Sequence, residues 1–319
     1  MTAPPSLGRE ERFLTLLSAR FASQDAQVRH GIGDDAAIIA SPHAPLALTV
    51  DTQVEDVHFR KGYLSWRALG RRAYIVSVSD LAAMGAKPYA ALAALTLPPY
   101  VDDAMFTELC DGMAEAATDI GAPIVGGNLS GGTLLSLTMT LVGSMEGEGL
   151  QRTGARPEHR IYVTGTLGAA ALGLYCLEHG ESSAAAQPFI ERWRHPHARI
   201  AEGLKLNAVA SAAIDLSDGL SMDLQRLCSS SSVGAKIYSE RLPLEPGHRA
   251  MSQQLGLDSA SVAIHGGEDY ELLYTCTDDR GIAAQLGTCI GEITKAQGVQ
   301  FLDAEGRALK LAAPTYGAW

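Results

Sequence analysis

The sequence has 319 residues, of which 46% are hydrophobic and 19% are charged, and it contains 33 glycines. This length exceeds the roughly 250 to 300 residues at which a single core usually stops growing, so the sequence predicts two globular domains. The net charge of -11 argues against non-specific binding to nucleic acid or anionic membranes, because both need a basic surface. An anionic substrate would then need a divalent cation to offset repulsion by the acidic protein.

Cysteine usage and hydropathy predict a cytoplasmic protein. The five cysteines are odd in number and form no C-x-x-C pair, which is typical of reduced thiols rather than of a disulfide framework. The sequence has no run of about 18 uninterrupted apolar residues, and its first residues lack the charged start and apolar run of a signal peptide.

The first half of the chain predicts alternating helices and strands. Alternation after residue 45 predicts a strand with Leu48 and Val50 on one face. Thr49 and Asp51 then lie on the opposite face. In chain order we expect a helix over 10–22, a turn over 31–35, a strand over 46–54, a helix over 67–84, a strand over 90–97, a helix over 103–120, and strands over 123–127 and 133–144.

A polar, glycine-rich segment over 145–158 separates the two halves, so we predict domains over 1–147 and 148–319. The second half predicts strands over 161–165, 213–217, 236–238 and 271–276, and helices over 167–179, 197–209 and 219–230. Helices and strands are mixed within both halves, which indicates an α/β or α+β fold in each domain.

The first chemical motif is GIGDDAA over residues 31–37. Two glycines permit a tight turn, and Asp34 and Asp35 offer the oxygen ligands that Mg²⁺ prefers. An ordinary Asp-rich turn that caps a helix is the structural alternative.

Further acids lie where apolar segments meet loops, the usual location of ligand sites. They are Asp51, Asp80, Asp215 and Asp218. Each also has a structural interpretation: Asp80 as a helix N-cap, Asp215 as the partner of a backbone amide, and Asp218 as the turn residue before Gly219. Their joint occurrence favours one shared metal site.

Two further motifs contain paired glycines. Residues 126–132 read GGNLSGG after an apolar strand, and these glycines would let backbone N–H groups approach a phosphate. Residues 265–271 read HGGEDYE, a glycine pair followed by acids, just before an apolar strand. A hairpin connection and a turn with solvated carboxylates are the alternatives. His58 and His265 are candidate phosphate contacts, although a single histidine is more often structural.

The sequence lacks the motifs of several common phosphate-handling and hydrolytic folds. It has no G-x-x-x-x-G-K-[ST], no H-R-D with D-F-G, and no G-x-S-x-G. A nucleotide site without a P-loop must neutralise phosphate charge in another way, and carboxylate-bound Mg²⁺ ions would do so.

Taken together and in order, these motifs resemble the thiamine-monophosphate kinase family of the aminoimidazole ribonucleotide synthetase-like superfamily. The resemblance runs almost end to end, through GIGDDAA, VDTQVEDVHF, SDLAAMGAKP, the GGN loop, RTGARP, IYVTGTLG, AIDLSDGL and HGGEDYELLYT. It implies two α/β domains, an N-terminal domain that forms a barrel in a homodimer, and an ATP site between the domains. It also implies Mg²⁺-dependent transfer of the ATP γ-phosphate to thiamine phosphate, the last step of thiamine diphosphate biosynthesis.

The resemblance further implies roles for individual residues. The expected Mg²⁺ ligands are Asp35, Asp51, Asp80, Asp215 and Asp218, with more oxygens from Thr49, the backbone of Val50, and Asn128. Among these, the expected catalytic residues are Asp51, Asp80 and Asp218. The expected ATP contacts are Gly127, Asn128, Arg152 and Ser217, and the expected thiamine-phosphate contacts are His58, Glu268 and a C-terminal aromatic residue, Trp319 or Tyr316.

One position departs from the family pattern. The glycine loop of well-known members carries an Asp and a nearby Arg, whereas this chain has Asn128 followed by Gly131 and Gly132. An amide oxygen can ligate a metal but brings no charge, so the ligand role of Asn128 stays open. Two alternatives also stay open: an enzyme of the same superfamily with another acceptor, and a non-catalytic nucleotide- or metal-binding regulator.

Overall fold

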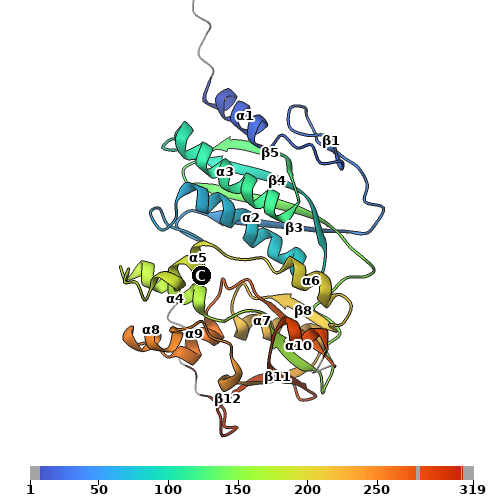
Figure 1. The fold of residues 1–319 in the computed structure, drawn as a ribbon, viewed down its shortest axis with the longest axis vertical. Coiled ribbons are helices and arrows are strands. Elements are labelled where there is room, and N and C mark those ends of the chain that lie inside the picture. Colours follow the sequence, from blue (N-terminus) through green and yellow to red (C-terminus); the bar gives the residue numbers. More distant parts are fainter. Residues whose placement is uncertain (1–7, 278–280, 310, 312–319) are drawn as a thin grey trace, which may run out of the picture. The chain divides into compact units, whose positions relative to one another are not determined.

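The computed structural model describes residues 8–277, 281–309 and 311 (Figure 1). The described chain forms two compact units. The first comprises the described residues up to Ser77 together with Pro88–Ser144, and the second comprises Val78–Lys87 together with the described residues from Met145 onward. The sequence pattern did not indicate that residues 78–87 belong with the second unit, and the domain boundary at residue 147 stays a prediction. No helix in the described ranges has both the length and the apolar character that a membrane span requires.

The first unit is built on a four-stranded sheet in the order β3-β6-β4-β5. Strands β3 and β6 pair antiparallel, and β4 and β5 pair parallel. The strands are β3 (Leu46–Val54), β4 (Lys87–Leu97), β5 (Ile124–Gly131) and β6 (Ser136–Ser144), and a separate pair is formed by β1 (Val28–His30) and β2 (Ile38–Ile39).

The alternation predicted for β3 is confirmed. Leu48 is 69% exposed and Val50 is 62% exposed, so both lie on an open face of the sheet. Thr49 and Asp51 lie on the other face and are less exposed. The edge strand of the first unit therefore carries an apolar row on its open face.

Three helices complete the first unit: α1 (Arg9–Arg20), α2 (Trp66–Ala83), whose last residues belong to the second unit, and α3 (Asp103–Ile120). Helices α2 and α3 cross in backbone contact. A Cβ atom added to Gly70 would lie 2.0 Å from the Leu109 oxygen, and one added to Gly112 would lie 1.9 Å from the Arg67 oxygen. Only glycine permits this approach, because the neighbouring atoms are backbone and cannot rotate away.

We therefore expect Gly112→Ala to destabilise the protein by at least about 1–3 kcal/mol, the usual cost of overpacking. Gly131→Ala is the matched control, because a Cβ at Gly131 meets nothing within 4 Å. Urea denaturation of the two variants measures the difference. Equal midpoints would contradict the close helix crossing.

The second unit contains a six-stranded, mostly antiparallel sheet in the order β12-β9-β11-β7-β10-β8, in which only β9 and β12 pair parallel. The strands are β7 (Arg160–Val163), β8 (Ala212–Asp215), β9 (Gly234–Tyr238), β10 (Leu272–Cys276), β11 (Thr288–Thr294) and β12 (Gly298–Leu302). Its helices are α4 (Ala169–Glu178), α5 (Gln187–Arg194), α6 (Ile200–Leu206), α7 (Leu220–Ser231), α8 (His248–Gln254), α9 (Ser259–His265) and α10 (Ile282–Leu286), with a 3₁₀ turn over Ser239–Arg241.

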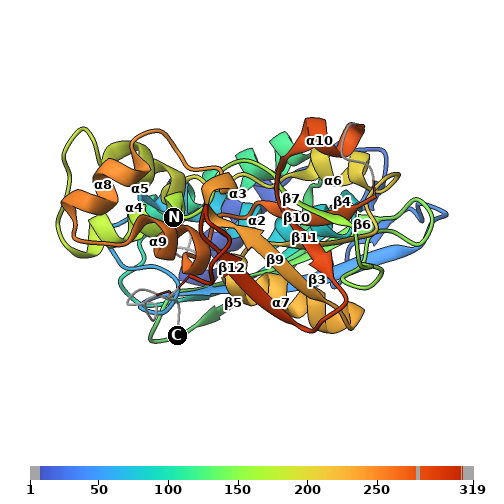
Figure 2. The same cartoon turned by 90° about the horizontal axis from the view of Figure 1, so that it is seen from below.

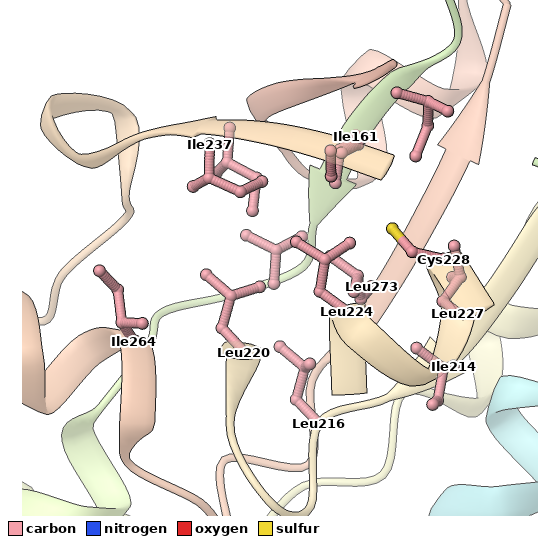
Figure 3. Close-up of a cluster of buried hydrophobic side chains, with 14 of the residues drawn as sticks. Ile161, Ile214, Leu216, Leu220, Leu224, Leu227, Cys228, Ile237, Ile264 and Leu273 are labelled. Carbon is pink, nitrogen blue, oxygen red and sulfur yellow. The ribbon is translucent and has the colours of Figure 1, made fainter. Parts of the chain in front are cut away.

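Helix α7 packs on the sheet of the second unit, beside β9 and β12 (Figure 2). Leu220, Leu224 and Leu227 recur at helical spacing and are all buried. They meet strand residues such as Ile214 and Leu273 in one apolar cluster (Figure 3). Helices α4, α5, α8 and α9 form a separate group with its own apolar cluster. The mixed α/β fold class predicted from the sequence is confirmed.

Candidate functional site

The GIGDDAA loop lines a cavity of about 970 Å³ in the first unit. The cavity lies between this loop, helix α1 and residues of β4, β5 and β6. Its size is within the range of small-molecule sites. Asp35 is exposed, and its N–H donates to Asp34 Oδ1 at 2.8 Å. The loop therefore places the carboxylates of Asp34 and Asp35 at the edge of a mostly apolar cavity.

Gly127 and Asn128 line the same cavity. Both lie in β5, where Gly127 pairs with Ala93 of the parallel strand β4. A Cβ at Gly127 would lie 1.8 Å from the Ala93 oxygen, so this position requires glycine. The structure thus brings together Asp35, Gly127 and Asn128, which the sequence assigned to metal and nucleotide binding.

The other predicted site residues of the first unit are not among those that line the cavity. Thr49 and Asp51 lie on the opposite face of β3 from Val50, whose side chain is on the open face. His58 follows the end of β3, and its Nδ1 accepts a hydrogen bond from the Val54 N–H at 3.1 Å. The neutral His58 ring then carries its proton on Nε2.

Asp215 ends strand β8 in the second unit and is almost fully buried. Ser79 Oγ donates a hydrogen bond to Asp215 Oδ2 at 2.9 Å. The pKa of Asp215 is raised to about 7, mainly by burial and next by the negative charge of Asp80, while the Ser79 hydrogen bond and Arg152 oppose the shift. Asp80 lies inside the last turns of helix α2, so the alternative that it is a helix N-cap is wrong.

Asp218 lies in the loop between β8 and α7 and is tied to α7 through two residues that the sequence analysis did not select. Its backbone N–H donates to Asp223 Oδ2 at 3.0 Å, and its carboxylate pairs with Arg226. Arg226 Nη1 also donates to Asp223 Oδ1 at 2.7 Å. Burial raises the pKa of Asp223 to about 6. The motif AIDLSDGLSMDL contains Asp223, but only the fold shows that this side chain anchors the loop.

The AIDLSDGL and HGGEDYE motifs, distant in sequence, meet in the second unit. The Glu268 N–H donates to the Ser217 oxygen at 2.8 Å, and the Tyr270 N–H donates to the Leu216 oxygen at 2.9 Å. These bonds extend the antiparallel pairing of β8 with β10. Ser217, Asp218 and Glu268 are therefore neighbours at the same end of the sheet. His265 lies at the end of α9, and burial lowers its pKa.

A buried ionic network supports the HGGEDYE loop. Glu271 is fully buried and accepts two hydrogen bonds from Arg199, at 2.6 Å and 2.8 Å, and one from Thr164 Oγ1 at 2.6 Å. Arg192 also contacts Glu271, and its Nη2 donates to the backbone oxygen of Asp269 at 3.0 Å. Sequence reasoning missed both arginines, which lie more than 70 positions away from Glu271 in the chain.

The described ranges contain no group of three or more His, Cys, Asp or Glu side chains that could hold a metal ion alone. Mg²⁺ commonly takes only one or two protein carboxylates, with substrate phosphates and water as the remaining ligands. Asp80 and Asp215 fit this pattern, because the charge of one raises the pKa of the other and a cation would relieve the repulsion. Trp319 and Tyr316 lie outside the described residues.

The chain is similar to known proteins over most of its length. Residues 33–145 match the family model described as "AIR synthase related protein, N-terminal domain". The thiamine-monophosphate kinase of Escherichia coli K12 is 38% identical over 289 residues, which cover 86% of this chain and 87% of the relative.

Two solved structures are similar over almost the whole chain. The thiamine-monophosphate kinase of Stenotrophomonas maltophilia K279a superposes with a TM-score of 0.83 at 33% identity, covering 94% of this chain and 98% of the relative. A structure described as AaThiL complexed with AMPPCP and TMP has a TM-score of 0.79 at 31% identity and covers 99% of this chain and 98% of its own.

Proposed function

Because the chain belongs to the thiamine-monophosphate kinase family, we propose that it transfers the γ-phosphoryl group of ATP to thiamine phosphate, giving ADP and thiamine diphosphate. The observation that carries this proposal is the 38% identity to a curated thiamine-monophosphate kinase over 86% of the chain. AMPPCP and TMP, the ligands named for a solved relative, support ATP and thiamine phosphate as the two substrates.

The proposal assigns Mg²⁺ binding to carboxylates of both units. In the first unit the candidates are Asp35 and Asp51, with Thr49, the backbone of Val50, and Asn128; in the second they are Asp80, Asp215 and Asp218. When bound, Mg²⁺ would neutralise phosphate charge during the transfer. Gly127, Asn128, Arg152 and Ser217 are the proposed nucleotide contacts, and His58 and Glu268 the proposed thiamine-phosphate contacts.

The chain's own residues then have mainly a positioning task. Both reactants are anions, so alignment of the acceptor oxygen with the γ-phosphorus and relief of charge repulsion supply most of the acceleration. The oxygen of a phosphate monoester is largely ionised at neutral pH, and for this reason direct transfer needs no obligatory general base. No protein nucleophile takes part in this scheme.

The proposal includes a homodimer. The exposed apolar row of β3, formed by Leu46, Leu48 and Val50, supports a partner on the open face of the first unit's sheet. A mass near the 33.6 kDa of one chain in light scattering would argue against the dimer. A cytoplasmic location stays a prediction from the sequence.

A coupled assay of ADP release tests the proposed function. The purified chain is incubated with ATP and Mg²⁺, with and without thiamine phosphate, and with other phosphorylated acceptors. We expect ADP release only with thiamine phosphate. Release with a different acceptor would identify another enzyme of the superfamily, and ATP binding without release would favour a regulator.

Binding of Mg²⁺ is expected to strengthen as the pH rises from about 6 to 8. The pKa of Asp215 is raised to about 7 in the metal-free protein, so below that pH a cation must displace a proton. Calorimetric titration with Mg²⁺ in two buffers of different ionisation enthalpy measures the released proton. An affinity that is constant over this range would contradict metal binding at Asp215.

A further inference from the structure

Helix α5 contacts the loop that carries Glu268. Trp193 Nε1–H donates a hydrogen bond to Glu268 Oε2 at 2.6 Å. Trp193 is completely buried, and it follows Arg192, which reaches the Asp269 oxygen and Glu271. Two consecutive residues of one short helix thus contact three residues of the loop: the Glu268 carboxylate, the Asp269 backbone oxygen and the buried Glu271 carboxylate.

The loop backbone adopts an unusual conformation at the same place. Glu268 has a φ of 67° and Tyr270 a φ of 52°, although neither is glycine. Residues other than glycine rarely adopt a positive φ. They keep such a conformation where the surrounding structure holds the backbone in place. Here the N–H groups of Glu268 and Tyr270 are both fixed to the loop after β8. The backbone bonds hold the main chain of Glu268, and the indole N–H contacts its carboxylate.

The chemistry of the donor supports a role in orientation. An indole N–H donates one hydrogen bond and carries no charge, so it directs a carboxylate without neutralising it. Arg192 and Arg199 pair with Glu271, which is fully buried. A carboxylate held in one direction by a neutral donor suits contact with a cationic group, such as the thiazolium ring of thiamine phosphate.

We propose that Trp193 is a positioning residue that directs the Glu268 carboxylate toward thiamine phosphate, an inference that rests on the proposed function. The competing explanation is that Trp193 only fills space in the second unit. The two explanations differ in which kinetic constant changes when the indole N–H is removed.

The test compares steady-state kinetics of the wild type with Trp193→Phe, Glu268→Gln and the double variant. Phenylalanine keeps most of the buried ring and loses the donor. We expect Trp193→Phe to raise the KM for thiamine phosphate about tenfold and to leave the KM for ATP within about twofold. In the Glu268→Gln background the same substitution is expected to have no further effect, because Trp193 acts through Glu268.

Two further variants separate orientation from packing. Phe189→Leu, on the same helix, is the control for general damage, since Phe189 is buried in the apolar cluster of α4, α5, α8 and α9. We expect it to lower the thermal midpoint without changing the ratio of the two KM values. Trp193→His retains a ring N–H donor and is expected to bring the KM for thiamine phosphate back to within about threefold of the wild type. If Trp193→Phe does not fold, this variant and the control decide.

The proposal is overturned if Trp193→Phe changes both KM values equally, or if its effect multiplies with that of Glu268→Gln. The proposal is also overturned if Trp193→His folds and has the same ratio of the two KM values as Phe189→Leu, and its KM for thiamine phosphate nevertheless stays high. Failure of the proposed function is distinguishable, because the wild type itself would then release no ADP with thiamine phosphate.

Discussion

Replacing Asp80 with asparagine is expected to lower kcat at least about 100-fold, equivalent to about 2.7 kcal/mol of transition-state stabilisation. Asp80 lies in the last turns of α2, where its charge raises the pKa of Asp215. Asparagine keeps the size of the side chain and removes the charge that would hold Mg²⁺. The measurement is the rate of ADP release at saturating ATP, thiamine phosphate and Mg²⁺.

Asp119→Asn is the matched control for this variant. Asp119 lies near the end of α3, its side chain is 60% exposed, and it pairs with Arg71 at the surface. Surface pairs of this kind contribute little, so kcat is expected to stay within about twofold of the wild type. Normal turnover in a folded Asp80→Asn variant would remove Asp80 from the catalytic site and make its role structural.

Replacing Glu271 with glutamine is expected to lower the free energy of unfolding by about 3–5 kcal/mol. Glu271 is fully buried and pairs with both Arg192 and Arg199, so the amide leaves two guanidinium groups without their counter-charge. Glutamine also replaces one of the two carboxylate oxygens that accept from Thr164 and Arg199 with an NH2 donor. Urea denaturation at neutral pH, followed by circular dichroism, measures the loss.

The control for this effect is Glu292→Gln. Glu292 pairs with Arg160 across neighbouring strands β11 and β7, but both side chains are at least one-third exposed. We expect this substitution to cost less than about 1 kcal/mol. If both variants lose the same free energy of unfolding, burial is not the reason that the Glu271 network stabilises the fold.

The best-predicted elements were those whose ends carry a local signal. Helix α3 was predicted with its observed bounds, because Asp102 caps its start through a 2.8 Å bond from the Met105 N–H and Gly121 ends it with a φ of 75°. Strand β3 was also predicted with its observed bounds, because one of its faces is open and its residues alternate.

The elements that were missed are short or depend on distant partners. Helix α5 has eight residues and no capping side chain, too few for a clear period, and yet it carries Arg192 and Trp193. Strand β11 gains its hydrogen bonds from β7 and β9, which come far earlier in the chain. Local pattern contains no information on such pairings.

The site was predicted in its residue types and less well in its geometry. Asp35, Gly127 and Asn128 were selected from separate motifs and line one cavity. The meeting of Ser217 with Glu268 follows from the antiparallel register of β8 and β10, which no single motif encodes. Asp223 and Arg226 were not predicted as site residues. A loop can be anchored by a single well-placed side chain, and such a residue has no sequence signature of its own.

The most direct test of the central claim is a single-turnover reaction with ATP radiolabelled at its γ-phosphate, Mg²⁺ and thiamine phosphate. We predict that the label appears in thiamine diphosphate in an amount equal to the ADP formed, and that EDTA abolishes both products. Label in free phosphate alone, or ADP formed equally without thiamine phosphate, would contradict assignment of this chain as a kinase acting on thiamine phosphate.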